Sequence, residues 1–183
     1  MSCRSAILID NFLDQSKFDN LSAKVAASSA YNTTTVQDLR DDLFTEVYTA
    51  VFDRLKEIKL YQPHFDESIK LFGYNQFRPA NEGYGNFNGP HFDHGGYVFY
   101  IHPHWDESWE GKIKITNADE EQYRNGIYAK PNRFIWIDPG TYHDVTTTAS
   151  NTTHARVANI AFLGGDIHVD PSGISFINIT TTT

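Results

Sequence analysis

The chain has 183 residues, of which 40% are hydrophobic and 14% aromatic, so it can bury an ordinary core. Its formal net charge is -8, from 15 basic and 23 acidic residues, without a basic stripe that would neutralise a phosphate backbone. These values favour one globular domain spanning residues 1–183 and disfavour non-specific binding to nucleic acid.

The sequence gives no sign of secretion or of a membrane segment. Its single cysteine, Cys3, cannot form an internal disulfide, and the N-terminal residues lack the pattern of a signal peptide. No apolar stretch approaches the roughly 20 residues that a membrane-spanning helix needs. We therefore expect an intracellular, cytoplasmic protein.

The chain begins with the pattern of a strand and a helix. Residues 5–13 form an apolar run that predicts a short buried strand. Asp14 follows this run and can cap a helix whose apolar side is made by Phe18, Leu21 and Val25.

A second, longer helix is predicted after a small polar loop. Thr34 and Gln37 have the spacing of a capping box, and the helix is expected to continue to about Lys59. Its apolar residues recur every three or four positions, as in a helix that lies on a larger body. They are Phe44, Tyr48, Val51, Leu55 and Ile58.

After residue 60 the pattern changes to short aromatic and β-branched runs separated by Pro, Gly and Asn. These runs predict strands at residues 69–77, 97–101, 112–116, 133–137, 142–147, 155–163 and 174–180. The predicted fold class is α+β, with a double-stranded β-helix (jelly-roll) core over residues 61–180. The helices of residues 1–60 are expected to pack against the larger sheet.

The pattern His, aromatic, Asp occurs three times, beginning at His64, His91 and His104. Only the middle copy combines neighbouring glycines with predicted strands on both sides, and glycine permits close backbone approach to a site. Side chains two residues apart on an extended chain point to the same side, so His91 and Asp93 converge. The sequence therefore favours this pair as metal ligands.

The best candidate for a third ligand is His143, in the segment RFIWIDPGTYHDVTTT. Two histidines and one carboxylate leave coordination positions open, an arrangement typical of non-haem Fe(II) oxygenases. We interpret His91, Asp93 and His143 as iron ligands on this basis.

The order of these features resembles the prolyl-hydroxylase branch of the Fe(II)- and 2-oxoglutarate-dependent dioxygenases. The resemblance rests on GPHFDHGGYVFYIHPHWDESWEGKIKI, AKPNRFIWIDPGTYHDVTTT and ARVANIAFL, between about Phe72 and Phe162. It implies that His91, Asp93 and His143 bind Fe(II). It also implies that Arg156 pairs with the distal carboxylate of 2-oxoglutarate and that Tyr100 donates a hydrogen bond to the same carboxylate.

The resemblance also implies the reaction, which is hydroxylation of a substrate by O2 with release of succinate and CO2; ascorbate is a candidate accessory reductant. Peptidyl proline, another amino-acid side chain, a nucleobase or a small metabolite remain open as substrates, and so does the oligomeric state. Arg156 suits its implied role independently of the family, because the planar guanidinium binds a carboxylate through two parallel charge-assisted hydrogen bonds.

The chain departs from the family pattern in three places. The loop between Asp93 and Tyr97 is shorter than usual, and the insert between His143 and Arg156 is longer. At residues 110–111, Glu and Gly stand where the family often has two consecutive glycines.

Two other functions remain open from the sequence. A jelly-roll domain can bind a ligand or partner without turnover, since such folds serve many functions. A zinc hydrolase would also suit His, Asp and His, although it gives Arg156 no task. Of the other histidines, we expect His102 and His104 in a surface turn and His154 and His168 exposed.

Overall fold

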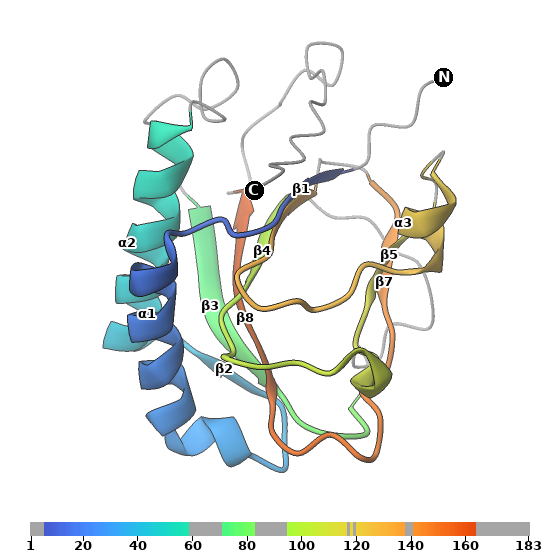
Figure 1. Cartoon of the computed structure of the whole chain (residues 1–183), viewed down its shortest axis with the longest axis horizontal. Coiled ribbons are helices and arrows are strands. Elements are labelled where there is room, and N and C mark those ends of the chain that lie inside the picture. Colours follow the sequence, from blue (N-terminus) through green and yellow to red (C-terminus); the bar gives the residue numbers. More distant parts are fainter. Residues whose placement is uncertain are drawn as a thin grey trace.

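Two helices cover one face of an antiparallel sheet, and a smaller antiparallel sheet faces the other side (Figure 1). The helices are α1 (Gln15–Ala27) and α2 (Asp42–Glu57). This computed structural model describes residues 6–58, 71–82, 95–116, 118, 120–137 and 141–163. The mixture of helices and antiparallel sheets confirms the predicted α+β class, while the jelly-roll core stays a prediction.

In the described part of the chain, the larger sheet has six strands in the order β1-β6-β4-β8-β3-β2. Their bounds are β1 Ala6–Ile9, β6 Phe134–Ile137, β4 Gly96–Tyr100, β8 Arg156–Leu163, β3 Leu71–Arg78 and β2 Gln37–Leu39. The smaller sheet pairs β5 (Ile113–Ile115) with β7 (His143–Val145). Short helices η1 (Ser29–Asn32), η2 (Glu107–Trp109) and α3 (Glu121–Asn125) lie in the connections.

The first helix forms as its sequence predicts. The side chain of Asp14 accepts a hydrogen bond from the backbone N–H of Lys17 at 2.9 Å, satisfying one of the donors that a helix leaves unpaired at its N-terminus. Phe18, Leu21 and Val25 are buried against the larger sheet.

The predicted start of the second helix is wrong. Residues Gln37–Leu39 form strand β2 and pair with β3, and α2 begins after Asp41, whose carboxylate accepts from the N–H of Phe44 at 2.9 Å. A capping box at Thr34 would need the backbone of residue 37 in a helix, but strand pairing uses it instead. The buried side of α2 is also shifted, to Val47, Ala50, Val51 and Leu55.

Alternation along β8 divides its side chains between two cores. Val157 and Ala161 pack with the helices, whereas Ala158 and Ile160 belong to the core between the two sheets. Side chains two apart on a strand share a face, so Arg156 points into the space between the sheets. The fold thereby turns a cationic side chain inward.

His102 lies in the interior, contrary to the surface turn expected for it. Its side chain is 0% exposed, with Nε2 2.6 Å from the carbonyl of Ala129 and Nδ1 3.1 Å from the backbone nitrogen of Val157. A neutral ring donating from Nε2 and accepting at Nδ1 satisfies both contacts. Burial lowers the pKa of His102 to about 3.

His154 is half-buried rather than exposed, and its ring stacks on Tyr31 with centroids 4.5 Å apart. His102 follows β4 and His154 precedes β8, and both rings pack against Trp105, with centroids 5.1 and 5.9 Å away. His168, the predicted strand at 174–180 and the motif beginning at His64 lie outside the described residues. Over the residues described, no helix is long and apolar enough to cross a membrane.

Candidate active-site pocket

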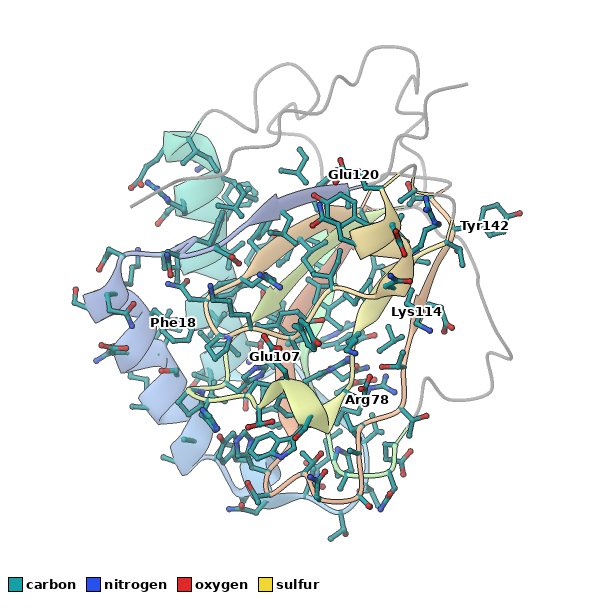
Figure 2. The ribbon with its side chains drawn as sticks, turned by 45° about the vertical axis from the view of Figure 1, so that its right-hand side comes forward. Phe18, Arg78, Glu107, Lys114, Glu120 and Tyr142 are labelled. Carbon is teal, nitrogen blue, oxygen red and sulfur yellow. The ribbon has the colours of Figure 1, made fainter. Side chains whose placement is uncertain are left out.

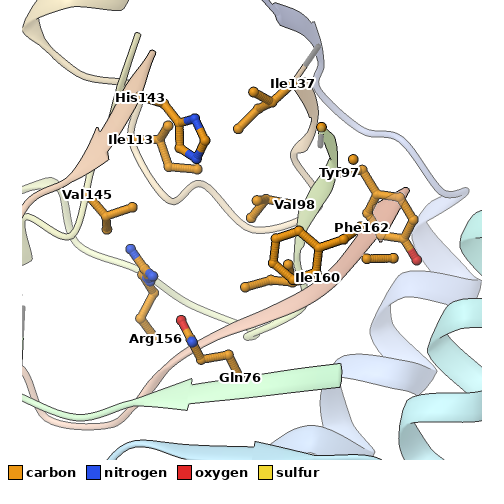
Figure 3. A pocket seen from close by; sticks show the side chains of 13 residues that line it. Gln76, Tyr97, Val98, Ile113, Ile137, His143, Val145, Arg156, Ile160 and Phe162 are labelled. Atoms are coloured by element: carbon orange, nitrogen blue, oxygen red, sulfur yellow. The ribbon is translucent and has the colours of Figure 1, made fainter. Parts of the chain in front are cut away.

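A pocket opens between the two sheets (Figure 3). The empty space within it, including the part open to solvent, is about 520 Å³. Among the described residues, the polar groups that line it come from Gln76, His143 and Arg156. The apolar side chains in its wall are Val98, Ile113, Ile137, Val145, Ile160 and Phe162. A few polar groups in an apolar wall are typical of a site that binds and orients a small molecule.

His143 is the first residue of β7 and lies opposite Ile115 of β5. Its Nδ1 is 2.9 Å from the carbonyl oxygen of Thr141. A carbonyl only accepts, so Nδ1 carries the proton, and in this tautomer Nε2 has the lone pair that a metal requires. The preceding Tyr142 is 44% exposed and extends away from the body (Figure 2).

Arg156 approaches the same space from the larger sheet, and Figure 3 shows its guanidinium and the His143 ring directed into one pocket. The residue is 3% exposed, and its Nη1 donates to the carbonyl of Gly111 at 2.6 Å. A buried guanidinium is costly unless it is hydrogen-bonded and its charge is balanced. This placement agrees with the expected anion-binding role, which stays a prediction.

Tyr100 lies beside Arg156, with the guanidinium carbon 5.8 Å from the centre of its ring. It is fully buried, and among the residues that the structure describes no group accepts or donates a hydrogen bond at its hydroxyl. Buried hydroxyls are usually hydrogen-bonded. Burial raises the pKa of Tyr100, so the hydroxyl stays protonated and can donate.

A second arginine, Arg78, was not predicted as part of the site. It is 3% exposed, lies directly opposite Arg156 in the β3–β8 register, and donates to Oε1 of Gln76 at 3.0 and 3.3 Å. Gln76 in turn donates to Asp38 of β2 at 3.2 Å. The sequence signal was the alternation Tyr74, Gln76, Arg78, which places polar groups on the pocket face of β3.

Two of the three predicted metal ligands, His91 and Asp93, lie outside the described residues. Within the described ranges, no group of three His, Cys, Asp or Glu side chains could hold a metal ion. The structure therefore places His143 and Arg156 in the wall of one pocket, with Tyr100 beside Arg156, and the complete ligand set stays a prediction.

The chain was compared with known proteins by sequence and by structure, and only the structural comparison found matches. No model of a known family and no curated protein sequence matches the chain. Solved structures do match. A prolyl-4-hydroxylase from Pseudomonas putida is 14% identical with a TM-score of 0.61, over 86% of this chain and 91% of that one. The chain shares its fold with prolyl hydroxylases.

Two further structures agree. One is a prolyl hydroxylase from Trichoplax adhaerens, solved with a hypoxia inducible factor peptide fragment, at 14% identity and a TM-score of 0.55; 86% of this chain and 82% of that one are covered. The other is the 2-oxoglutarate complex of a viral collagen prolyl hydroxylase from Paramecium Bursaria Chlorella virus-1. It is 11% identical, with a TM-score of 0.52 over 87% and 96% of the two chains. At these identities the likeness concerns the fold alone.

Proposed function

We propose that this chain is an Fe(II)- and 2-oxoglutarate-dependent dioxygenase with a double-stranded β-helix core. One observation carries the proposal: the pocket receives an imidazole in the metal-binding tautomer, from His143, and a buried guanidinium, from Arg156, on opposite walls. A metal bound by His143 could be chelated by the keto-acid end of such a ligand. Arg156 could then bind the carboxylate at the other end.

The residues present fit the cosubstrate. The hydroxyl of Tyr100 is a buried donor next to Arg156, and a carboxylate oxygen would satisfy it. The positive charge of Arg78 acts on the same hydroxyl in the same direction as that of Arg156. An anion is thus favoured at this end of the pocket.

In the proposed enzyme, His91, Asp93 and His143 would hold Fe(II), and Arg156 with Tyr100 would bind the distal carboxylate of 2-oxoglutarate. Bound iron and 2-oxoglutarate supply the oxidising chemistry with O2, which yields succinate, CO2 and a hydroxylated product. The chain's own residues would orient the cosubstrate, and the apolar wall of Val98, Ile160 and their neighbours would shield part of it from water.

Peptidyl proline is the first substrate to test, because the solved structures of similar fold include prolyl hydroxylases from three sources. Free amino acids and small metabolites follow. A screen for succinate release over peptide and metabolite pools, with and without ascorbate, would identify the substrate class.

The proposal is tested directly by adding Fe(II) and 2-oxoglutarate to the protein without oxygen. We expect the weak visible charge-transfer absorption of the iron chelate, absent when either component is omitted. Tight zinc binding with no such absorption would support a zinc hydrolase instead. Failure to bind any metal would support a non-catalytic domain.

A further inference from the structure

The turn that joins η2 to β5 has an unusual backbone. Glu110 has φ 56° and ψ -134°, and Gly111 follows with φ +66°. Side chains other than glycine rarely occupy this region, and such residues persist only where the surroundings hold them. Two consecutive residues in positive φ, the first of them a glutamate, therefore call for an explanation.

Three contacts hold Glu110 in this conformation. Its carbonyl accepts from the indole N–H of Trp105 at 3.1 Å, and its carboxylate pairs with the ammonium of Lys112 at 3.1 Å. Its backbone also forms an isolated antiparallel β-bridge with Thr148, which lies between β7 and β8. The turn is consequently fixed from both directions of the chain and from a segment distant in sequence.

The turn contacts the side chain of Arg156 directly. The carbonyl of Gly111 is aimed at the guanidinium and accepts from Nη1 at 2.6 Å, within the buried space between the sheets. A Cβ at position 111 would lie 3.2 Å from Cδ of Arg156 and 3.1 Å from Cγ2 of Thr148. Gly111 is needed both for its positive φ and for the room that the arginine side chain occupies.

We propose that the Glu110–Gly111 turn positions Arg156, with Gly111 as the positioning residue that directs the guanidinium toward the distal carboxylate of a dicarboxylic keto acid. The inference rests on the proposed function for its ligand. The turn would act only on the anchored end of that ligand, because its contact is with the arginine and not with His143.

The test compares two keto acids on Gly111→Ala. One is 2-oxoglutarate, and the other is 2-oxobutyrate, which chelates a metal in the same way but lacks the distal carboxylate. Dissociation constants are measured by calorimetry on protein loaded with Fe(II) without oxygen. We expect roughly tenfold weaker binding of 2-oxoglutarate, the equivalent of one charge-assisted hydrogen bond, with binding of 2-oxobutyrate and of the metal unchanged.

Asn11→Ala is the matched control. Asn11 also has a positive φ, of 52°, but it is exposed, lies in the turn after β1 and does not line the pocket. It should leave both keto acids bound as in the wild type. Equal weakening of the two keto acids by Gly111→Ala, or no weakening of either, would overturn the inference.

Failure of the proposed function is distinguishable from failure of this inference. If the wild type binds no 2-oxoglutarate, the proposed function falls, and the turn is tested by nitrogen-15 NMR of the Arg156 guanidinium, assigned with Arg156→Lys. Slow exchange and restricted rotation of the Nη1 group should be lost in Gly111→Ala; their retention contradicts the inference. If Gly111→Ala does not fold, Trp105→Phe removes the donor to Glu110 and should produce the same changes in smaller degree.

Discussion

The imidazole of His143 and the guanidinium of Arg156 enter one pocket from two different sheets. One belongs to β7 of the smaller sheet and the other to β8 of the larger, and the loop between them crosses the end of the structure. Because His143 and Arg156 belong to different sheets, a substitution of one residue can be tested for its effect on binding at the other.

Replacement of Arg156 by alanine should separate the binding of 2-oxoglutarate from the binding of the metal. We expect 2-oxoglutarate to bind roughly 100-fold more weakly, because two charge-assisted hydrogen bonds are lost, while the affinity for Fe(II) changes less than about twofold. Anaerobic titration followed by calorimetry measures both. Arg124→Ala, an exposed residue on α3, is the control. Loss of metal and 2-oxoglutarate binding together would mean that Arg156 is structural.

Tyr100→Phe should weaken binding of 2-oxoglutarate without weakening the fold. The hydroxyl is buried and, in the described part of the chain, has no hydrogen-bond partner, so its removal costs no internal bond. We expect roughly tenfold weaker binding and a free energy of unfolding, for the ligand-free protein, that is equal or higher. Chemical denaturation and calorimetry provide the two readouts. A clear loss of stability would show that the hydroxyl has a structural partner.

His102 should make the protein less stable in mild acid. Its folded-state pKa of about 3 lies below the unfolded value of 6.5, so the unfolded chain binds the proton more readily and stability is lost as the pH falls below 6.5. Between pH 8 and pH 5 the contribution to the free energy of unfolding should fall by about 2 kcal/mol.

The measurement for His102 is urea denaturation at a series of pH values. His102→Gln should be less stable than the wild type at pH 8 but should show a shallower decline toward pH 5, because the amide does not titrate. An equally steep decline in the variant would assign the effect to other groups.

The start of α2 can be tested by removing its cap. Asp41→Ala should lower the free energy of unfolding by about 1 kcal/mol, because the N–H of Phe44 loses its acceptor. Thr34→Ala is the matched control and should change stability by less than about 0.5 kcal/mol, since Thr34 is exposed and outside the helix. The reverse order of effects would favour a helix that begins at the earlier residue.

Patterns confined to one element predicted much of this structure. Asp14 caps its helix because the first N–H groups of a helix have no acceptor within it, and a carboxylate one position before the helix can supply one. The runs at 97–101, 133–137 and 155–163 form strands β4, β6 and β8 with small shifts at their ends. Period-two alternation also accounts for the shared pocket face of Arg156 and Gln76, although Gln76 was not predicted as a site residue.

Several features depend on neighbours that are remote in sequence. Gln37–Leu39 is a strand rather than a helix start because β3 supplies backbone partners. His102 is buried because carbonyl and N–H groups of Ala129 and Val157 meet it from two other segments. No local pattern contains that information, since hydrogen-bond partners of this kind are brought together only when the sheet has formed.

The sequence by itself determined which chemical groups are available, namely the candidate ligands His91, Asp93 and His143 and an arginine on an inward-facing strand. Only the tertiary structure decided that Arg156 lies against Tyr100 and receives the carbonyl of Gly111. The physical reason is that strand alternation fixes the face on which a side chain lies, whereas the packing of two sheets and a strained turn fixes its direction within that face.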